Sequence, residues 1–439
     1  MFSSLSVKDT LLHDISLMAD NSSAFSKRPG IDFSRSRKLD FKSLLHFQLS
    51  MEGGSINQEL LKYFSFSSFT PTVSAFLQQR SKLNPNTFEH LFHQFLSHFP
   101  LNLYKDKYLL LACDGSTFTY TRAPLDVDSY YAPDGKSLKG FNQLHLIALF
   151  DLLSQRYCDA ILQPIRKKNE FLALSTLMDR FQCPSAVPIF IADRGFHSYH
   201  VFAHAIEQGS FFLIRAKDIN TKRLLGKEEP ETDTYDVDVS RILSRTRSKR
   251  KHLHPEREDD YRFICKSVAF DYINDYCPEY TLSLRVIRIK ISEEVYENII
   301  TNLPRDEFPT DELKKLYALR WGIETSFCKL KHTIGAQNLH SKTYEFITHE
   351  LWARLILYNF CAVITEQVTI KGRKRKYQYQ INYNVAFNAC HYLLKLHKGE
   401  EPPNIEGLIG QYILPVRPGR TYARQHRYQI PISFTYRFS

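Results

Sequence analysis

The chain has 439 residues, of which 43% are apolar and 24% charged, and its net charge is +11. This length is enough for roughly two to four domains with a sizeable core, and the apolar share excludes wholesale disorder. A basic excess together with 13% aromatic residues suits a polyanionic partner, of which nucleic acid is the first candidate.

The eight cysteines are scattered and form no CxxC pair, which argues against a cysteine zinc site or a disulfide framework. This usage indicates a reducing compartment. Residues 1–20 lack the basic-then-apolar order of a signal peptide, and no run approaches the roughly 20 apolar residues of a membrane span. We therefore expect a cytoplasmic protein with no membrane partner.

Residues 1–104 predict a helical domain. Apolar residues recur there at spacings of three and four in the segments FKSLLHFQLSM, TVSAFLQQRSKL and TFEHLFHQFL. Basic loops connect these helices. Such a domain is a candidate for binding the ends of a DNA substrate, and the alternative is a simple helical cap.

Residues 105–216 alternate between predicted strands and predicted helices. The strands are the apolar runs YLLLACD, LHLIALFDL, YCDAILQPI, AVPIFIAD and FFLIRAK. Between them NEFLALSTLMDRF and YHVFAHAIEQG have the period of helices. This alternation predicts an α/β core whose sheet has a parallel portion and is covered on both faces.

The remaining chain divides into three further segments. Residues 217–305 are rich in β-branched and aromatic residues, as in YRFICKSVAFDY and YTLSLRVIRIKI, and we interpret them as a β-rich insertion. Residues 306–345 return to the core with one long helix. Residues 346–439 predict a C-terminal helical region that ends in a basic tail.

Two aspartates are candidates for chemistry because each follows an apolar strand. Asp114 and Asp193 both end such a run and are expected to precede a turn. In open α/β sheets, ligands bind at the carboxyl ends of the strands. The two carboxylates therefore meet if their strands are neighbours.

The helix around YALRWGIETSFCKLKH supplies a third carboxylate, Glu324. At about 100° per residue, its polar side chains fall within an arc roughly 60° wide; they are Tyr317, Arg320, Glu324 and Lys331. This line abuts the apolar stripe, which favours a half-buried site over a solvated pair of Arg320 with Glu324. The stripe consists of Leu316, Leu319, Ile323, Phe327, Leu330 and Ile334.

Three carboxylates without nitrogen or sulfur ligands suit Mg²⁺, with Mn²⁺ as a substitute. Two such ions roughly 3.5–4 Å apart activate a hydroxyl and stabilise the leaving oxygen of a phosphodiester. His197 and His200 follow Asp193, and we expect them to pack or to face DNA instead of binding a metal. Trp321 is expected to pack in the core.

The three segments together resemble the DDE transposases of bacterial insertion sequences, in particular the insertion sequence four family. The third segment of that group reads Tyr-x2-Arg-x3-Glu-x6-Lys, which matches Tyr317, Arg320, Glu324 and Lys331 without a gap. TNLP before the helix and the segment ADRGFHSYHVFAHAIEQGSFFLIRAK are also similar. The resemblance covers roughly residues 105–345.

This resemblance implies a ribonuclease-H-like catalytic core with a β-rich insertion. Asp114, Asp193 and Glu324 would be catalytic and would hold two divalent ions. The reaction would be cleavage at the transposon ends, through a hairpin in many members, followed by strand transfer into target DNA. Contacts to phosphate near the cleaved end would come from Tyr317, Arg320 and Lys331.

Other basic residues are candidates for DNA contacts through their position beside the site or in basic segments; they are Arg194, Lys249, Arg250, Arg373 and Lys374. The implied partners are double-stranded DNA, as terminal inverted repeats and target, and a second copy of the chain in a synaptic dimer. The implied location is the cytoplasm of a bacterium, at the nucleoid.

Two alternatives stay open at this stage. Instead of an active transposase, the chain could be a ribonuclease-H-like nuclease without strand transfer, or an inactive DNA-binding relic of a transposase. The complete polar line on the third segment argues against the first, and the presence of all three carboxylates argues against the second.

Overall fold

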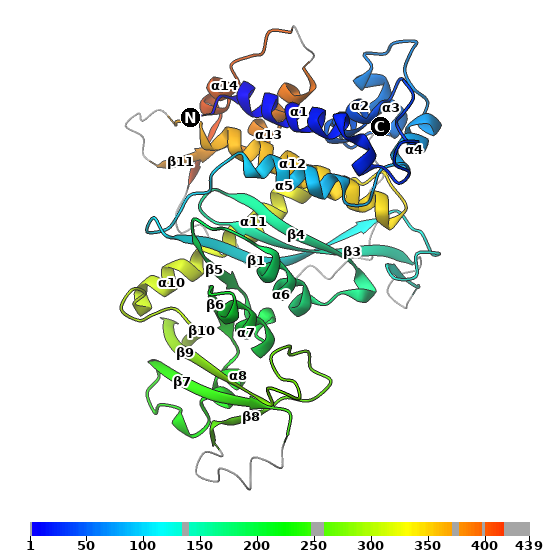
Figure 1. Cartoon of the computed structure of the whole chain (residues 1–439). Helices are drawn as coiled ribbons and strands as arrows, with labels where there is room; N and C mark the ends of the chain where they lie inside the picture. Colours follow the sequence, from blue (N-terminus) through cyan, green and yellow to red (C-terminus); the bar gives the residue numbers. More distant parts are fainter. Residues whose placement is uncertain (1, 134–139, 247–258, 371–376, 397–399, 417–439) are drawn as a thin grey trace.

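The computed structural model describes residues 2–133, 140–246, 259–370, 377–396 and 400–416. Its centre is a mixed sheet of ten strands, with helices at both ends of the chain stacked above it (Figure 1). The strands are β1 (Tyr108–Tyr120), β2 (Tyr130–Tyr131), β3 (Phe141–Asp151), β4 (Arg156–Pro164), β5 (Val187–Ala192), β6 (Phe211–Ala216), β7 (Tyr235–Ser244), β8 (Tyr261–Phe263), β9 (Glu279–Ser292) and β10 (Val295–Thr301).

Five strands form the core in the order β4-β3-β1-β5-β6. β3 is antiparallel to both of its neighbours, whereas β1, β5 and β6 are mutually parallel. This arrangement is that of a ribonuclease-H-like core. The α/β fold class predicted from the sequence, with helical regions at both ends, is confirmed.

The sheet continues beyond β6 through the residues interpreted as an insertion. β10 pairs antiparallel with β6, and β9, β7 and β8 follow in that order. β8 ends at Phe263, so the β-rich composition of residues 261–272 corresponds to a strand only at its start. The reason is Arg245, whose guanidinium donates to the carbonyl oxygens of Cys265, Val268 and Phe270 at 3.0–3.2 Å and folds this segment into a loop.

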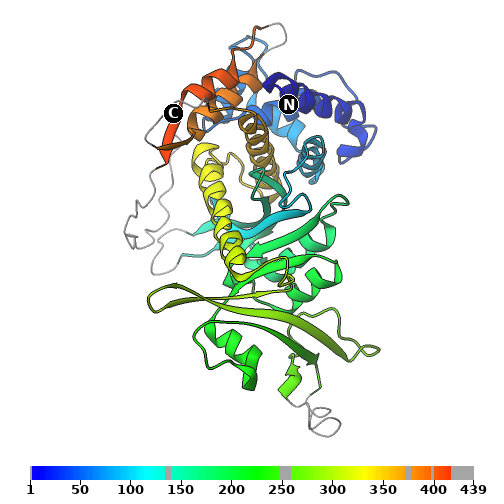
Figure 2. The same ribbon diagram turned by 90° about the vertical axis from the view of Figure 1, so that its left-hand side faces the viewer.

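Helices cover the two faces of the sheet. One face carries α6 (Glu170–Arg180) and α7 (Tyr199–Glu207), and the other carries α10 (Thr310–Leu319) and α11 (Trp321–Cys328). In Figure 2 the yellow α10 and α11 and the green helices lie on opposite sides of the strands. Because successive side chains of a strand alternate in direction, β1 places Leu110 and Ala112 in one core and Leu109 and Leu111 in the other.

Above the sheet the N- and C-terminal helices pack into one layer. This layer contains α1 (Ser4–Asp20), α2 (Phe41–Ser50), α3 (Ile56–Tyr63), α4 (Val73–Arg80), α5 (Thr87–Ser97), α12 (Tyr344–Glu366), β11 (Gln378–Ile381), α13 (Tyr383–Lys395), α14 (Ile405–Gln411) and β12 (Ile413–Val416). α8 (Asp218–Leu225) lies apart from it, near β7 and β8 at the lower end of Figure 1. Polar side chains cap several of these helices; for example, the Asp40 side chain accepts from the Ser43 N–H at 2.7 Å.

α12 is the centre of this layer and is buried from Ile347 to Ile364. Its charged residues are paired inside: Glu350 lies 3.3 Å from Arg80, and Arg354 donates to the Met51 carbonyl. No helix among the described residues has the length and apolar character needed to span a membrane.

His349 on α12 joins this helix to the N-terminal region, because its Nε2 lies 3.1 Å from the Asn84 carbonyl oxygen. Burial lowers the pKa of His349 to about 4. Since the folded state disfavours the imidazolium, its contribution to stability is lost as the pH falls from about 6.5 towards about 4.

We therefore predict that His349→Gln reduces the difference in unfolding free energy between pH 7 and pH 5 by about 2 kcal/mol. Urea denaturation at the two pH values measures this difference. His13→Gln is the control, because His13 is exposed. An undiminished pH dependence in His349→Gln would contradict the assignment.

Candidate active site

The parallel pairing of β1 with β5 brings the two candidate aspartates together. Cys113 pairs with Ala192, so Asp114 and Asp193 follow at neighbouring positions. Asp193 ends its strand as predicted, and its side chain accepts from the Gly195 N–H at 2.7 Å. The prediction of a turn after Asp114 was wrong, because β1 continues to Tyr120 with β3 as its antiparallel partner.

The strand pleat also sets the direction of these side chains. Cys113 and Ala192 lie in the core beneath α6 and α7. The next residue of each strand therefore points to the opposite face, where α11 lies. Asp114 and Asp193 thus face the helix that carries Glu324.

Arg320 connects that helix to the sheet. Its guanidinium lies 2.7 Å from Glu324 Oε1 and 3.7 Å from Asp114 Oδ2, and its side chain is only 8% exposed. The Tyr317 ring lies 5.8 Å from the same guanidinium. Lys331 Nζ lies 5.0 Å from the ring of Phe118 on β1. The polar line of the third segment therefore faces the carboxylate side of the sheet.

The sequence had predicted one regular helix for the third segment, and the structure shows that this prediction was wrong. Bonds from the Arg320 N–H to Tyr317 O and from the Ile323 N–H to Arg320 O, both 3.1 Å, tighten the backbone between α10 and α11. A π-helical turn, η6 (Lys329–Thr333), follows α11.

Two predictions for this segment were wrong as a result of the tightened turn. Leu319 was expected in the buried stripe but is 43% exposed. Trp321 was expected in the core but is 53% exposed, with the Arg320 guanidinium 5.3 Å from its ring. Both residues flank Arg320, and the turn that directs its guanidinium inward leaves its neighbours at the surface.

The carboxylates repel one another. Burial raises the pKa of Asp114 to about 6, against the opposing effects of the Gly115 N–H and of Arg320, and the charges of Asp193 and Glu324 raise it further. Burial is thus the main cause of the shift, and the neighbouring acids add to it. Carboxylate oxygens are the donor atoms that hard divalent cations such as Mg²⁺ or Mn²⁺ prefer.

The sequence did not reveal a pair of polar residues against Gly115, on the α6 side of the sheet and opposite the Asp114 side chain. His145 on β3 lies 3.0 Å from Glu170, and a Cβ at Gly115 would come within 2.4 Å of the His145 ring. His145, and to a lesser extent Lys168, lowers the pKa of Glu170 to about 2 although burial opposes this. The one signal in the sequence was Gly115 itself, because glycine inside a strand marks a close approach.

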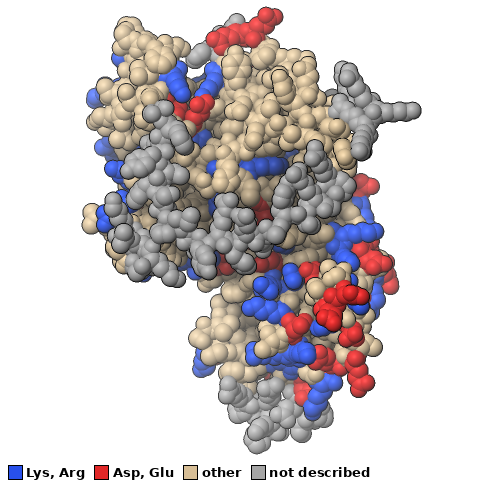
Figure 3. Space-filling view, turned by 180° about the vertical axis from the view of Figure 1, so that it is seen from behind, with Lys and Arg blue, Asp and Glu red and all other residues tan. Residues whose placement is uncertain are grey.

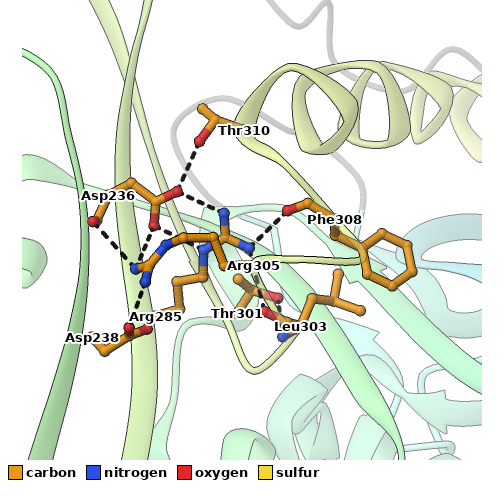
Figure 4. Close-up of polar contacts among 8 residues, drawn as sticks. All are labelled: Asp236, Asp238, Arg285, Thr301, Leu303, Arg305, Phe308 and Thr310. Atoms are coloured by element: carbon orange, nitrogen blue, oxygen red, sulfur yellow. Dashed lines mark hydrogen bonds and ion pairs between the residues drawn. The ribbon is translucent and has the colours of Figure 1, made fainter.

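A buried ion network holds the start of α10 (Figure 4). Arg285 on β9 donates to both carboxylate oxygens of Asp236 on β7, at 2.6 and 2.8 Å, and to the Phe308 carbonyl at 2.8 Å. Thr310 at the first turn of α10 donates to the same carboxylate at 2.8 Å. The strands of residues 217–305 thereby fix where the Glu324-bearing segment begins.

The other candidate DNA contacts divide into two groups. Arg194 is exposed at the turn after Asp193. Seen from behind, basic and acidic side chains intermingle over the lower part of the molecule, so the net positive charge forms no single basic face there (Figure 3). The predicted contacts that lie outside the described residues are Lys249, Arg250, Arg373 and Lys374.

The fold and this carboxylate cluster define a ribonuclease-H-like protein with a candidate site for phosphodiester chemistry. The family model described as "Transposase DDE domain" matches residues 105–360, which is more than half of the chain. The chain therefore belongs to the DDE transposase family, whose members generally use divalent metal ions.

Among curated proteins none matches the chain significantly. A piggyBac transposase synaptic complex with hairpin DNA, solved by cryo-electron microscopy, is similar at 10% identity over 96% of this chain and 87% of that chain, with a TM-score of 0.46.

We predict that Arg285→Leu lowers the free energy of unfolding by about 3–5 kcal/mol, because Asp236 then keeps only Arg305 and Thr310 as donors and the Leu303 and Phe308 carbonyls lose the buried guanidinium. Denaturant titration measures the loss. Arg305→Leu is the matched control, since Arg305 contacts the same carboxylate at 3.1 Å but is 46% exposed, and it should cost at most about 1 kcal/mol. Equal losses in the two variants would contradict the role assigned to Arg285.

Proposed function

We propose that the chain is a cut-and-paste DNA transposase of the insertion sequence four type. The observation that supports the proposal is that the Arg320 guanidinium lies 2.7 Å from Glu324 and 3.7 Å from Asp114, while Asp193 follows the neighbouring strand at the position beside Asp114. The protein would cleave the ends of its transposon through a hairpin intermediate and join these ends to target DNA.

In this proposal Asp114, Asp193 and Glu324 hold two Mg²⁺ ions, for which Mn²⁺ substitutes. Ions bound there supply an activated water or 3′-hydroxyl and stabilise the leaving oxygen. The chain's own residues position the substrate. Arg320 is held in place by two carboxylates and, as a planar donor, binds a phosphate in two-point fashion.

Lys331 is a second phosphate contact. Its ammonium is half-buried against Phe118, and within the described ranges no carboxylate pairs with it. Burial lowers the pKa of Lys331, because the charged form loses its hydration there. A phosphate anion would restore a favourable environment for this charge. Tyr317, next to Arg320, is the third contact at the cleaved end.

The wider DNA interface is assigned by segment. Residues 1–104 bind the terminal inverted repeats, residues 105–216 and 306–345 form the catalytic core, and residues 217–305 and 346–439 add basic contacts. Arg194, beside Asp193 and exposed, contacts the DNA near the reacting phosphate. A dimer of the chain joins the two ends, and the reaction takes place at the bacterial nucleoid.

The first test of the carboxylates is cleavage of a plasmid that carries the reading frame with its native flanking DNA. Purified protein with Mg²⁺ should cut at paired short inverted repeats that bracket the gene. Asp193→Asn and Glu324→Gln should each reduce cleavage by at least about 10³-fold, because each removes a metal ligand, while binding to the ends persists. Mapping the cuts at nucleotide resolution provides the measurement.

Other outcomes of this experiment favour other functions. Scattered nicks without joined products indicate a nuclease that lacks strand transfer. Firm binding to the flanks with no cuts in wild type indicates a DNA-binding relic. Undiminished cleavage by Glu324→Gln rules out the proposed triad.

We further predict that Lys331→Ala weakens binding to the transposon end and reduces the slope of log K against log salt by about one. Titrations by fluorescence anisotropy at several salt concentrations measure this slope. Lys329→Ala is the matched control, because Lys329 is equally half-buried but stacks on the Tyr383 ring at 4.3 Å, away from β1. An unchanged slope in Lys331→Ala excludes a phosphate contact.

A further inference from the structure

Two histidines on α7 form a cluster that the proposed reaction does not use. His200 and His204 are one helical turn apart, so both side chains lie on the same face of α7. They are 2% and 5% exposed, and their rings lie 4.3 Å apart. This face packs against α6, on the side of the sheet opposite α11.

The hydrogen bonds of α6 determine which nitrogen of His200 carries a proton. The Ser175 hydroxyl donates to the Leu172 carbonyl at 3.0 Å. Its oxygen is therefore the acceptor for His200 Nε2–H at 3.1 Å. Nδ1 of His200 is left with a lone pair, is buried, and has no hydrogen-bond partner.

His204 is arranged in the complementary way. Its Nδ1 lies 2.8 Å from Asp179 Oδ1, which can only accept, so this nitrogen carries the proton. Nε2 of His204 is buried without a hydrogen-bond donor and faces Asp271 Oδ2 at 3.3 Å. A lone pair that faces a carboxylate at this distance is unfavourable, so either a proton or a metal ion lies between the two atoms.

Three donor atoms therefore converge: His200 Nδ1, His204 Nε2 and a carboxylate oxygen of Asp271. One ligand atom from each of the three residues lies within 4.8 Å of the other two. We infer that His200, His204 and Asp271 form a binding site for a transition-metal ion of the zinc class, separate from the catalytic carboxylates. Two imidazoles and one carboxylate are ligands that Zn²⁺ takes, with a water in the fourth position.

The surrounding residues match what metal-binding histidines require. A ligating histidine usually donates its other N–H to a carboxylate or another acceptor, which fixes the ring and raises its basicity. Asp179 does this for His204, and Ser175 does it for His200.

The metal would fasten the loop between β8 and β9 to the core. Asp271 belongs to that loop, whose backbone Arg245 already organises, and Phe270 beside it is buried in the core under α7. Tyr280 at the start of β9 donates to Glu207 on the same helix at 2.8 Å. α7 begins shortly after Asp193. The bound metal would therefore stabilise the helix that follows β5, the strand that precedes Asp193.

A second cluster of similar composition provides a control. Glu89, His93 and Asp159 also lie close enough to hold an ion. Arg180 already occupies that position, with ion-pair distances of 3.2 Å to Glu89 and 2.5 Å to Asp159. A cation is therefore present there, and no metal is needed.

The test measures Zn²⁺ binding to the full-length chain after treatment with EDTA. Competition with a chromophoric chelator is performed in millimolar Mg²⁺, which occupies the catalytic carboxylates. The wild type should bind one Zn²⁺ that Asp271→Asn loses or binds at least about 10-fold more weakly, and Asp179→Asn should weaken binding about 10–100-fold. His93→Gln should bind as the wild type does.

Asp271 is 63% exposed, so Asp271→Asn should fold normally. Replacement of Zn²⁺ by Co²⁺ gives a second readout, a visible absorption band that His204→Ala removes. Equal Zn²⁺ affinity in wild type and Asp271→Asn would overturn the inference. A wild type that binds no Zn²⁺ would also overturn it, because a proton on His204 would then satisfy Asp179 and Asp271. Both measurements concern Zn²⁺ binding alone, so their outcome does not depend on whether the chain catalyses transposition.

Discussion

The ion contacts of Arg320 with Asp114 and Glu324 are the constraint on which the candidate site depends. A guanidinium that is 8% exposed needs carboxylate partners, and these come from a sheet strand and from its own helix. Through them the third segment is held against the end of the β1–β5 pairing. Burial is the main reason that the pKa of Asp114 is raised to about 6 there, and the charges of Asp193 and Glu324 add to it. The third segment is therefore fixed in place against a buried carboxylate of the sheet.

Two features outside the site maintain this arrangement. The pleat of β1 and β5 directs both aspartates towards α11. The preceding residues, Cys113 and Ala192, point into the core on the opposite side of the sheet. The network of Arg285 and Asp236 sets the start of α10, and with it the distance along the chain to Glu324. The strands of residues 217–305 thus take part in positioning the third carboxylate, since they extend the same sheet. On the other face, the histidines of α7 connect a loop of this segment to the core.

Much of the fold and of the site could be predicted from the sequence, because the signals were local. Apolar runs such as YLLLACD and AVPIFIAD identified the buried strands, and the spacing of Arg320 and Glu324 identified one helix face. The exposure of Leu319 and Trp321 follows from a local cause, the tightened turn at Arg320. The other failures depended on partners distant in sequence. β1 continues past Asp114 because β3 pairs with it, and residues 264–272 form a loop because Arg245 binds their carbonyl groups. The pairs His145–Glu170 and His204–Asp271 likewise join elements that no local pattern connects.

The most direct test of the central claim is an anomalous diffraction measurement on crystals of the chain soaked in Mn²⁺. The account predicts anomalous peaks between Asp114, Asp193 and Glu324, together with an Arg320 guanidinium that has moved away from Asp114. An absence of peaks at these carboxylates, with Arg320 still 3.7 Å from Asp114, would contradict it. That result would make the three acids and the arginine a structural ion network and not a site for catalytic metals.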